Sequence, residues 1–200
     1  EGMASRYKHG DDAITQDNDD VTVVFADIVG FEELSLSMTS EESVARLNDL
    51  IRTFDEAAER HGVERVRTTR QSYLASCGLG TPRVDNARRA VEFALELEAI
   101  LERYSAQQGV DLTLRAGLDS GKVTSGLIGR ARVVYDMWGD AVNLAFRVQG
   151  DSADPGIYIT QRVADRIPDS IPADPAGEIE TQSGTQRVWR VSAPAVVIEG

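Results

Sequence analysis

The sequence predicts a mixed α/β (α+β) domain with a ferredoxin-like βαββαβ core, a mainly antiparallel sheet with helices on one face, and extra C-terminal strands. Three observations lead to this fold class. Short apolar runs and longer stretches of helical periodicity follow in the order strand, helix, strand, strand, helix, strand. Glycine and proline residues separate these stretches. The 200 residues, 42% of them hydrophobic, suffice for one compact domain with a sizeable core.

The first half of the chain supplies most of this core. The elements expected in order are a strand at 21–26, a helix at about 40–60, strands at 63–69 and 72–79, and a helix at about 84–106. The first strand is short, apolar and β-branched. Thr39 with Glu42 resembles a capping box and places the start of the first helix. A tight turn at Thr69-Arg70-Gln71 joins the two strands that follow.

The second half adds shorter elements. Those expected are a strand at 111–119, a turn at Ser120-Gly121, a strand at 123–128, a helix at about 140–149, a strand at 157–160, a helix around 161–167, a loop at 168–177, and a hairpin of 179–182 with 186–192. The polar residues 1–20 have no periodicity and are expected to be a tail or a linker from an upstream region. One domain then covers 21–192, and 193–200 form a C-terminal tail.

Composition excludes several classes of protein. The formal net charge of −12 argues against nucleic-acid binding, since such domains are basic. The one cysteine excludes an internal disulfide, and the two histidines cannot build a zinc cluster. No run approaches the roughly 20 apolar residues of a membrane span, so no membrane contact is expected for this segment. The expected location is the cytoplasm, including the cytosolic part of a larger membrane-anchored protein.

Two segments carry the chemistry. In Phe25-Ala26-Asp27-Ile28-Val29-Gly30-Phe31, a carboxylate stands where a strand runs into a glycine-bearing turn, which suits binding of Mg²⁺ and phosphate. Taken alone, such an aspartate is more often a turn or cap residue. In the run from Tyr135 to Arg147, Asn143 and Arg147 lie four apart and share one helix face, where they can hold a sugar oxygen and a phosphate. By spacing alone, a solvated helix face is the favoured explanation of this pair.

Between these segments stands Arg115-Ala116-Gly117-Leu118-Asp119-Ser120-Gly121-Lys122-Val123. The three motifs, in this order, closely resemble the class III adenylyl/guanylyl cyclase catalytic (homology) domain over about residues 21–165. The resemblance implies conversion of ATP to 3′,5′-cyclic AMP and pyrophosphate for cyclic-nucleotide signalling. It also implies a head-to-tail dimer with active sites at the interface and two metal ions, Mg²⁺ or Mn²⁺, held by two aspartates of one subunit.

Most positions of the family's site match by residue type. The resemblance implies that Asp27 and the backbone carbonyl of Ile28 bind metal, and that the amides of Val29, Gly30 and Phe31 bind phosphate. It implies that Asp136 accepts from the adenine amino group. Asn143 orients the ribose and Arg147 stabilises the transition state. Lys122 falls where many members have an arginine that faces the terminal phosphates, and it keeps the charge without the bidentate fork.

The hairpin at 63–79 departs from the family pattern K-x-x-G-D-x-[YF]. Gln71 occupies the place of the second metal aspartate, so the affinity for Mg²⁺ or Mn²⁺ should fall. Arg70 replaces the turn glycine, where a positive φ would strain it. Arg67 replaces the base-reading lysine and remains a donor. The family's phosphate-binding lysine would fall near 181–183, where no lysine or arginine stands.

Three functions remain open. The first is an adenylate cyclase of weakened activity, acting on ATP with GTP as the alternative, in which Arg70 could neutralise phosphate charge in place of a metal. The second is a catalytically inactive pseudocyclase that serves as a regulatory or dimerisation module, or as the partner in a heterodimer that donates Asp136, Asn143 and Arg147. The third is a diguanylate cyclase-like domain, against which the turn Thr69-Arg70-Gln71 argues because it lacks that family's G-G-[DE]-E-F sequence.

Overall fold

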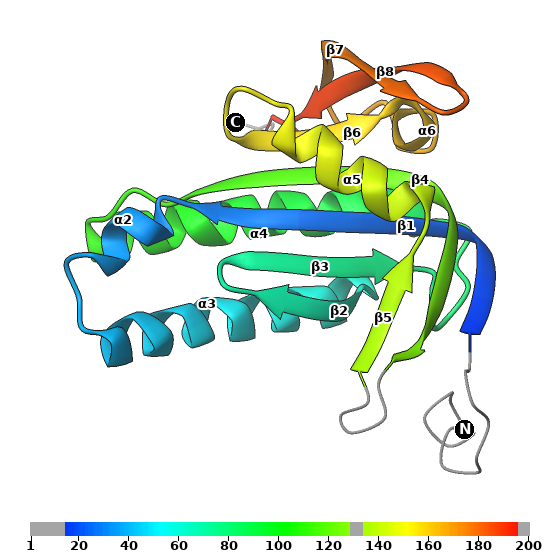
Figure 1. Ribbon diagram of the computed structural model, residues 1–200. Helices are drawn as coiled ribbons and strands as arrows, with labels where there is room; N and C mark the ends of the chain where they lie inside the picture. Colours follow the sequence, from blue (N-terminus) through cyan, green and yellow to red (C-terminus); the bar gives the residue numbers. More distant parts are fainter. Residues whose placement is uncertain (1–14, 129–133, 196–200) are drawn as a thin grey trace.

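The computed structural model describes residues 15–128 and 134–195 (Figure 1). Its helices and strands are, in chain order, β1 (Thr15–Val29), α2 (Phe31–Ser35), α3 (Ser40–His61), β2 (Glu64–Thr69), β3 (Ser72–Cys77), α4 (Asn86–Gln108), β4 (Thr113–Ile128), β5 (Val134–Trp138), α5 (Asp140–Gly150), β6 (Gly156–Thr160), α6 (Gln161–Ala164), β7 (Ala173–Thr181) and β8 (Gly184–Val191). The eight described strands form one sheet in the order β2-β3-β1-β4-β6-β8-β7, with β5 paired to β4 off this path.

The order of the first four strands confirms the predicted fold class. In β2-β3-β1-β4, every neighbouring pair is antiparallel, α3 connects β1 to β2, and α4 connects β3 to β4. This is the ferredoxin-like βαββαβ arrangement. The strand β6 then joins β4 in parallel, and β8 and β7 extend the sheet as the expected extra C-terminal strands.

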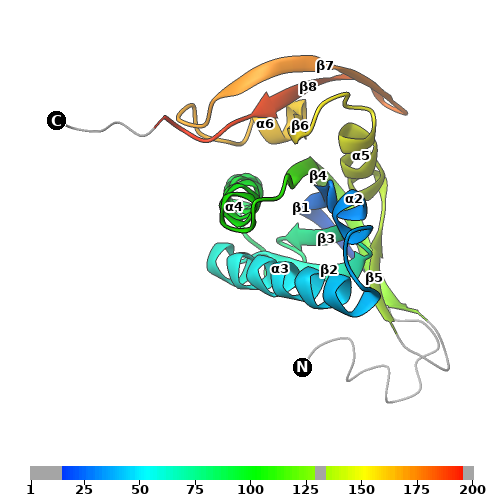
Figure 2. The same ribbon diagram turned by 90° about the vertical axis from the view of Figure 1, so that its left-hand side faces the viewer.

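The helices cover both faces of the sheet (Figure 2). Val24 and Ala26 of β1 pack in one apolar cluster with α3 and α4, whereas Val21 and Val23 pack with Ala141 of α5 in another. The two sets separate because successive residues of a strand point to opposite faces. The expectation that helices lie on one face therefore holds for α3 and α4, and α5 lies on the opposite face.

Several element boundaries differ from those expected. The strand β1 begins at Thr15, within the stretch expected to be a tail, and β7 begins at Ala173, within the loop expected at 168–177. The turn expected at Ser120-Gly121 is wrong: β4 runs straight through these residues, because both pair with β1 in the sheet. The strand β5, Val134–Trp138, was not expected from the sequence. Residues 1–14 and 196–200 of the two expected tails lie outside the described residues.

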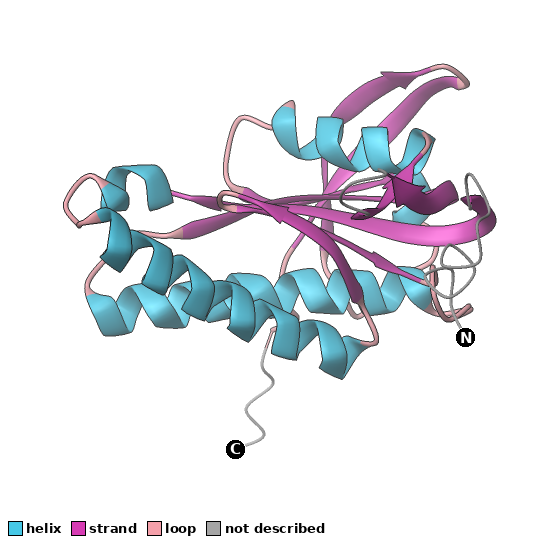
Figure 3. Cartoon of the chain, turned by 60° about the horizontal axis from the view of Figure 1, so that its bottom comes forward, coloured by secondary structure: helices cyan, strands magenta, loops and turns pink. Residues whose placement is uncertain are grey.

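Two local features position α5 and α3, the helices on either side of β1 (Figure 3). A Cβ atom on Gly117 would lie 2.0 Å from the Ala145 carbonyl oxygen, so only glycine lets α5 pack directly on β4. The expected capping box is present, with the Thr39 side chain accepting from the Glu42 amide and the Glu42 side chain accepting from the Thr39 amide. Among the described helices, none has the length and apolar character needed to span a membrane.

Candidate active site

One group of predicted site residues lies where β1 ends beside the β2–β3 turn. We call Asp27, Ile28, Gln71 and the turn Val29–Phe31 the metal half. The Ile28 amide donates to the Gln71 carbonyl oxygen at 3.1 Å, which ties the hairpin turn to β1. Asp27 pairs with Ser72 in the sheet register, and the Ser72 hydroxyl donates to Asp27 Oδ1. The structure thus brings these residues together from separate parts of the chain.

The turn that leaves β1 requires its glycine. Gly30 has φ +92°, and a Cβ atom there would lie 2.5 Å from the Asp111 carbonyl oxygen. Backbone in this region is strained for other residues. Gly30 therefore lets the chain reverse directly into α2, whose first residue, Phe31, is buried in the main core. Asp27 is thereby held near the end of β1, three residues before Gly30.

The β2–β3 turn keeps the glycine-like geometry without the glycine. Arg70 has φ +51°, the one positive φ of a residue other than glycine in the described part of the chain. Beside it, the Gln71 side-chain amide donates to Glu32 Oε1 at 3.3 Å. The sequence analysis expected strain at Arg70, and the backbone angle bears this out; it did not single out Glu32.

These residues fit one divalent cation better than two. Asp27 offers a carboxylate whose Oδ2 accepts no hydrogen bond from the described residues, and the Ile28 carbonyl lies beside it. Gln71 offers at most a neutral amide oxygen, and its nitrogen is directed at Glu32. Within residues 15–128 and 134–195, no three His, Cys, Asp or Glu side chains gather where they could hold a metal ion.

A second group, which we call the nucleotide half, consists of Arg67, Asp136, Asn143 and Arg147. Arg67 Nη1 lies 3.4 Å from Asp136 Oδ2, and the Met137 amide donates to Asp136 Oδ1 at 2.9 Å. Asn143 and Arg147 stand four residues apart on the exposed side of α5. Arg147 Nη1 donates to the Glu180 carbonyl oxygen at 2.9 Å, which holds its guanidinium against β7.

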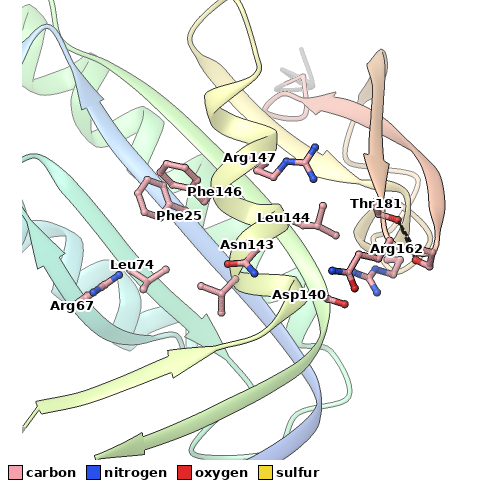
Figure 4. A pocket seen from close by; sticks show the side chains of 13 residues that line it. Phe25, Arg67, Leu74, Asp140, Asn143, Leu144, Phe146, Arg147, Arg162 and Thr181 are labelled. Carbon is pink, nitrogen blue, oxygen red and sulfur yellow. Dashed lines mark hydrogen bonds between the residues drawn. The ribbon is translucent and has the colours of Figure 1, made fainter. Parts of the chain in front are cut away.

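A cavity of about 470 Å³ opens between α5 and the β7–β8 hairpin (Figure 4). Its lining residues are Phe25, Arg67, Leu74, Asp140, Val142, Asn143, Leu144, Phe146, Arg147, Arg162, Thr181, Gln182 and Ser183. Three guanidinium groups and a single carboxylate line it, although the chain as a whole is strongly acidic. Such a local excess of positive charge favours an anionic ligand.

A smaller hollow of about 250 Å³ connects the two halves. Four residues line both this hollow and the larger cavity: Phe25, Arg67, Leu74 and Phe146. Thr69 and Ser72 line the smaller hollow in addition. Because Ser72 donates to Asp27, this hollow leads from the nucleotide half to the metal half.

Some residues were missed or are placed elsewhere. Phe25 and Phe146 form an edge-to-face pair with ring centroids 5.1 Å apart in the wall of the cavity. The alternation of β1 could have revealed Phe25, since it lies two residues before Asp27 and shares its face. No pattern in the sequence distinguished Arg162. Lys122 does not line the cavity: its ammonium lies 3.4 Å from Asp17 Oδ2 on the exposed surface.

Known proteins resemble this chain closely. The family model "Adenylate and Guanylate cyclase catalytic domain" matches residues 14–192. The adenylate cyclase of Mycobacterium tuberculosis is 33% identical over 94% of this chain, which covers 43% of that protein. The guanylate cyclase domain of RhGC from Catenaria anguillulae, solved in complex with GTP, is 30% identical with a TM-score of 0.82, covering 90% of this chain and 100% of that one. The adenylyl cyclase CyaB from P. aeruginosa is 25% identical with a TM-score of 0.81, covering 92% and 98%.

Proposed function

The chain belongs to the adenylate and guanylate cyclase catalytic domain family, and on this premise we propose that it converts ATP to 3′,5′-cyclic AMP and pyrophosphate at a reduced rate. The observation that carries the proposal is the cavity lined by Arg67, Asn143 and Arg147. Asp136 does not line this cavity itself, and it contacts Arg67 at its edge. The chain spans less than half the length of its mycobacterial relative, so regulation by other segments lies outside this proposal. The proposed domain includes residues before 21, since β1 begins at Thr15. The proposed location is the cytoplasm, where ATP is available.

In this reaction the ribose 3′-hydroxyl gives up its proton to solvent, and its oxygen attacks the α-phosphorus. The bond from the α-phosphorus to the oxygen that bridges to the β-phosphate breaks, and pyrophosphate leaves with that oxygen. Asp136 accepts a hydrogen bond from the adenine amino group, and Arg67 donates to the base. Asn143 holds the ribose in position for attack. Arg147 donates to the α-phosphate as charge develops there, which is the contribution that preorganised donors make to phosphoryl transfer. The amides of Val29–Phe31 bind the outer phosphates. Lys122, which pairs with Asp17 outside the cavity in the single chain, can join them only when that ion pair opens.

A divalent cation, Mg²⁺ or Mn²⁺, supplies Lewis-acid stabilisation of the phosphate charge when bound. Asp27 and the Ile28 carbonyl would hold it, and the Gln71 amide oxygen is the available substitute for a second carboxylate. A neutral oxygen contributes less to binding of a hard cation than a carboxylate does. Weak cation binding at this place is our reason for a reduced rate.

The two halves act across a dimer in this proposal. A head-to-tail pair of chains would set the metal half of one subunit against the nucleotide half of the other, as the family resemblance implies. The pair can be a homodimer or a heterodimer with another cyclase domain. A second function follows from the same arrangement: a pseudocyclase that lends its nucleotide half to an intact partner. It is favoured because the replacements Arg70 and Gln71 lie in the metal half, whereas Asn143 and Arg147 line a formed cavity.

Repair of the metal half tests the first function. The purified chain is assayed with ATP and with GTP, each under Mg²⁺ and under Mn²⁺, and compared with the double variant Arg70→Gly/Gln71→Asp. We expect higher activity with Mn²⁺ than with Mg²⁺ in the parent, and a gain of about 10–100-fold in the variant, because a second carboxylate restores metal stabilisation of the transition state. Adding Asp27→Asn to the variant should abolish the gain. An unchanged rate in the double variant would contradict the proposal.

Complementation tests the second function. The chain is mixed with an active homologous cyclase domain whose helix lacks the Asn and Arg at the positions of Asn143 and Arg147. Recovered activity supports lending of the nucleotide half. The matched control is this chain with Asn143→Ala/Arg147→Ala, which should restore nothing. No recovery with the unmodified chain would exclude the lending role.

A further inference from the structure

The wall of the cavity that faces α5 carries a cation from α6. Figure 4 shows Arg67 entering from β2 on one side of α5 and Arg162 on the other side, near the tip of the β7–β8 hairpin. The hairpin tip, Thr181–Ser183, offers hydroxyl and amide groups but no positive charge. Arg162 is therefore the cation that lines this end of the cavity together with Arg147.

A buried carboxylate fixes the Arg162 side chain. Its Nε lies 3.2 Å from Asp119 Oδ1, and its Nη2 donates to Asp119 Oδ2. Asp119 is 0% exposed, and the Thr160 hydroxyl also donates to its Oδ1 at 2.6 Å. Burial raises the pKa of Asp119 above its ordinary value, and the hydrogen bonds from Arg162 and Thr160 oppose that rise. The bidentate contact locks the plane of the guanidinium.

One edge of this guanidinium remains available. The side chain of Arg162 is 41% exposed, and its Nη1 makes no hydrogen bond to any described residue. A Cβ atom on Gly121 would lie 3.4 Å from this Nη1, so a glycine in β4 leaves room for the group to lie over the strand. A cation that is already oriented loses little side-chain entropy when an anion binds.

The order of groups along the cavity indicates which part of a nucleotide reaches Arg162. If the Arg67–Asp136 pair contacts the base and Asn143 the ribose, the phosphates reach the side of α5 away from Arg67, where Arg147 and Arg162 both line the cavity. We propose that Arg162, held in place by Asp119, binds the outer phosphates of the nucleoside triphosphate. This inference rests on the proposed function, since it names a residue for the same cavity. Asp119 is then a positioning residue.

The competing explanation is that Arg162 only neutralises Asp119. Removing Arg162 alone would leave an unpaired buried charge and would destabilise the fold in either case. The informative variant is therefore Asp119→Asn/Arg162→Gln, which keeps neutral hydrogen-bonding groups at both positions. Its matched control is Asp20→Asn/Arg166→Gln. That variant removes another bidentate Asp–Arg pair, close to Arg162 in the chain, that does not line the cavity.

The test measures dissociation constants for ATP, inorganic tripolyphosphate and AMP by calorimetry, in metal-free buffer with a chelator, so that no bound cation contributes and the metal half is the same in parent and variant. We expect the Asp119→Asn/Arg162→Gln variant to bind ATP and tripolyphosphate about 10-fold more weakly than the parent, since hydrogen bonds to charged groups are worth that much. Binding of AMP should stay the same, because AMP lacks the outer phosphates. The control variant should bind all three like the parent.

Two results would overturn the inference: tripolyphosphate binding that is equal in parent and variant, or no tripolyphosphate binding by the parent. A drop for ATP, tripolyphosphate and AMP alike would also overturn it, since it indicates a general loss of structure. Failure of the proposed function is a separate result. The parent could make no cyclic nucleotide and still bind tripolyphosphate more tightly than the Asp119→Asn/Arg162→Gln variant does. In that case the proposed function fails and the role of Arg162 stands.

Discussion

The metal half and the nucleotide half are built from neighbouring parts of one sheet but differ in what they retain. In the nucleotide half, Asp136 and Arg67 are paired and Arg147 is anchored to β7 around an open cavity. In the metal half, an arginine occupies backbone that favours glycine, and the Gln71 amide is directed at Glu32. Gln71 and the neighbouring Arg70 thus depart from the family pattern at the metal half, and Arg67 and the hairpin tip 181–183 depart from it at the nucleotide half. The fold around both halves is the same.

This difference teaches that the two halves can be lost separately. The Gly30 turn and the pairing of Asp27 with Ser72 are present although Gln71 stands where the family resemblance implies a carboxylate, because these contacts are made by the backbone and by β1. A subunit of this kind can still present Asp136, Asn143 and Arg147 to another subunit. The predictions below test whether the halves differ in function as they do in residues.

The largest effect is expected at Arg147. Replacing it by alanine (Arg147→Ala) should lower kcat with Mn²⁺ by about 100-fold or more, because loss of one preorganised transition-state donor costs that much. KM for ATP should change far less. The measurement is steady-state production of cyclic AMP, with Arg187→Ala on the exposed edge of β8 as the control for loss of one charge. An equal loss in both variants would mean that the nucleotide half has no special role.

A smaller effect is expected in the metal half at Ser72. The Ser72→Ala variant removes the hydroxyl that donates to Asp27, and loss of a hydrogen bond to a metal-binding carboxylate weakens metal binding by about 10-fold. Free Mn²⁺ measured by electron paramagnetic resonance gives the dissociation constant. Ser37→Ala serves as control, since the Ser37 hydroxyl donates to the Leu34 carbonyl oxygen outside the site. Unchanged Mn²⁺ affinity in Ser72→Ala would show that Asp27 needs no such support.

Sequence reasoning predicted what depends on local pattern. The order of the core elements, the capping box at Thr39 and the strain at Arg70 follow from periodicity and residue type. The course of β4 through Gly121 could not be predicted, because sheet pairing with β1 overrides the turn tendency of a glycine. The place of α5 on the opposite face depends on long-range packing against Gly117.

The site shows the same division. Asn143 and Arg147 were singled out by their motif, and both line the cavity, while their roles there stay predictions. Arg162 was not found from the sequence, because its proposed role depends on Asp119. Asp119 lies on β4, far from Arg162 in the sequence, and only the fold brings the two side chains into contact. Lys122 had the expected residue type but pairs with Asp17 on the surface in the single chain.

Selectivity for the base should respond to Arg67. In Arg67→Lys, a single flexible ammonium replaces the planar guanidinium beside Asp136. Lysine is the donor that the family pattern has at this position. We expect the ratio of kcat/KM for ATP over GTP to rise by about 10-fold, in the range of discrimination that one contact supplies. Assays with each nucleotide under Mn²⁺ provide the ratio. A ratio that stays constant would place base recognition outside the Arg67–Asp136 pair.

The smallest effect is on stability and arises from the turn of the metal half. Arg70 has φ +51°, and left-handed backbone costs about 1–2 kcal/mol for residues with a Cβ atom. Glycine relieves this strain but loses more entropy on folding, so Arg70→Gly should raise the free energy of unfolding by a net amount of about 1 kcal/mol, or about 2–4 °C in Tm. Arg70→Ala removes the same charge and keeps the strain, so it should not stabilise. If chemical denaturation gives both variants the same stability, the strain is not stored at this turn, and the metal half differs from the nucleotide half in its ligands alone.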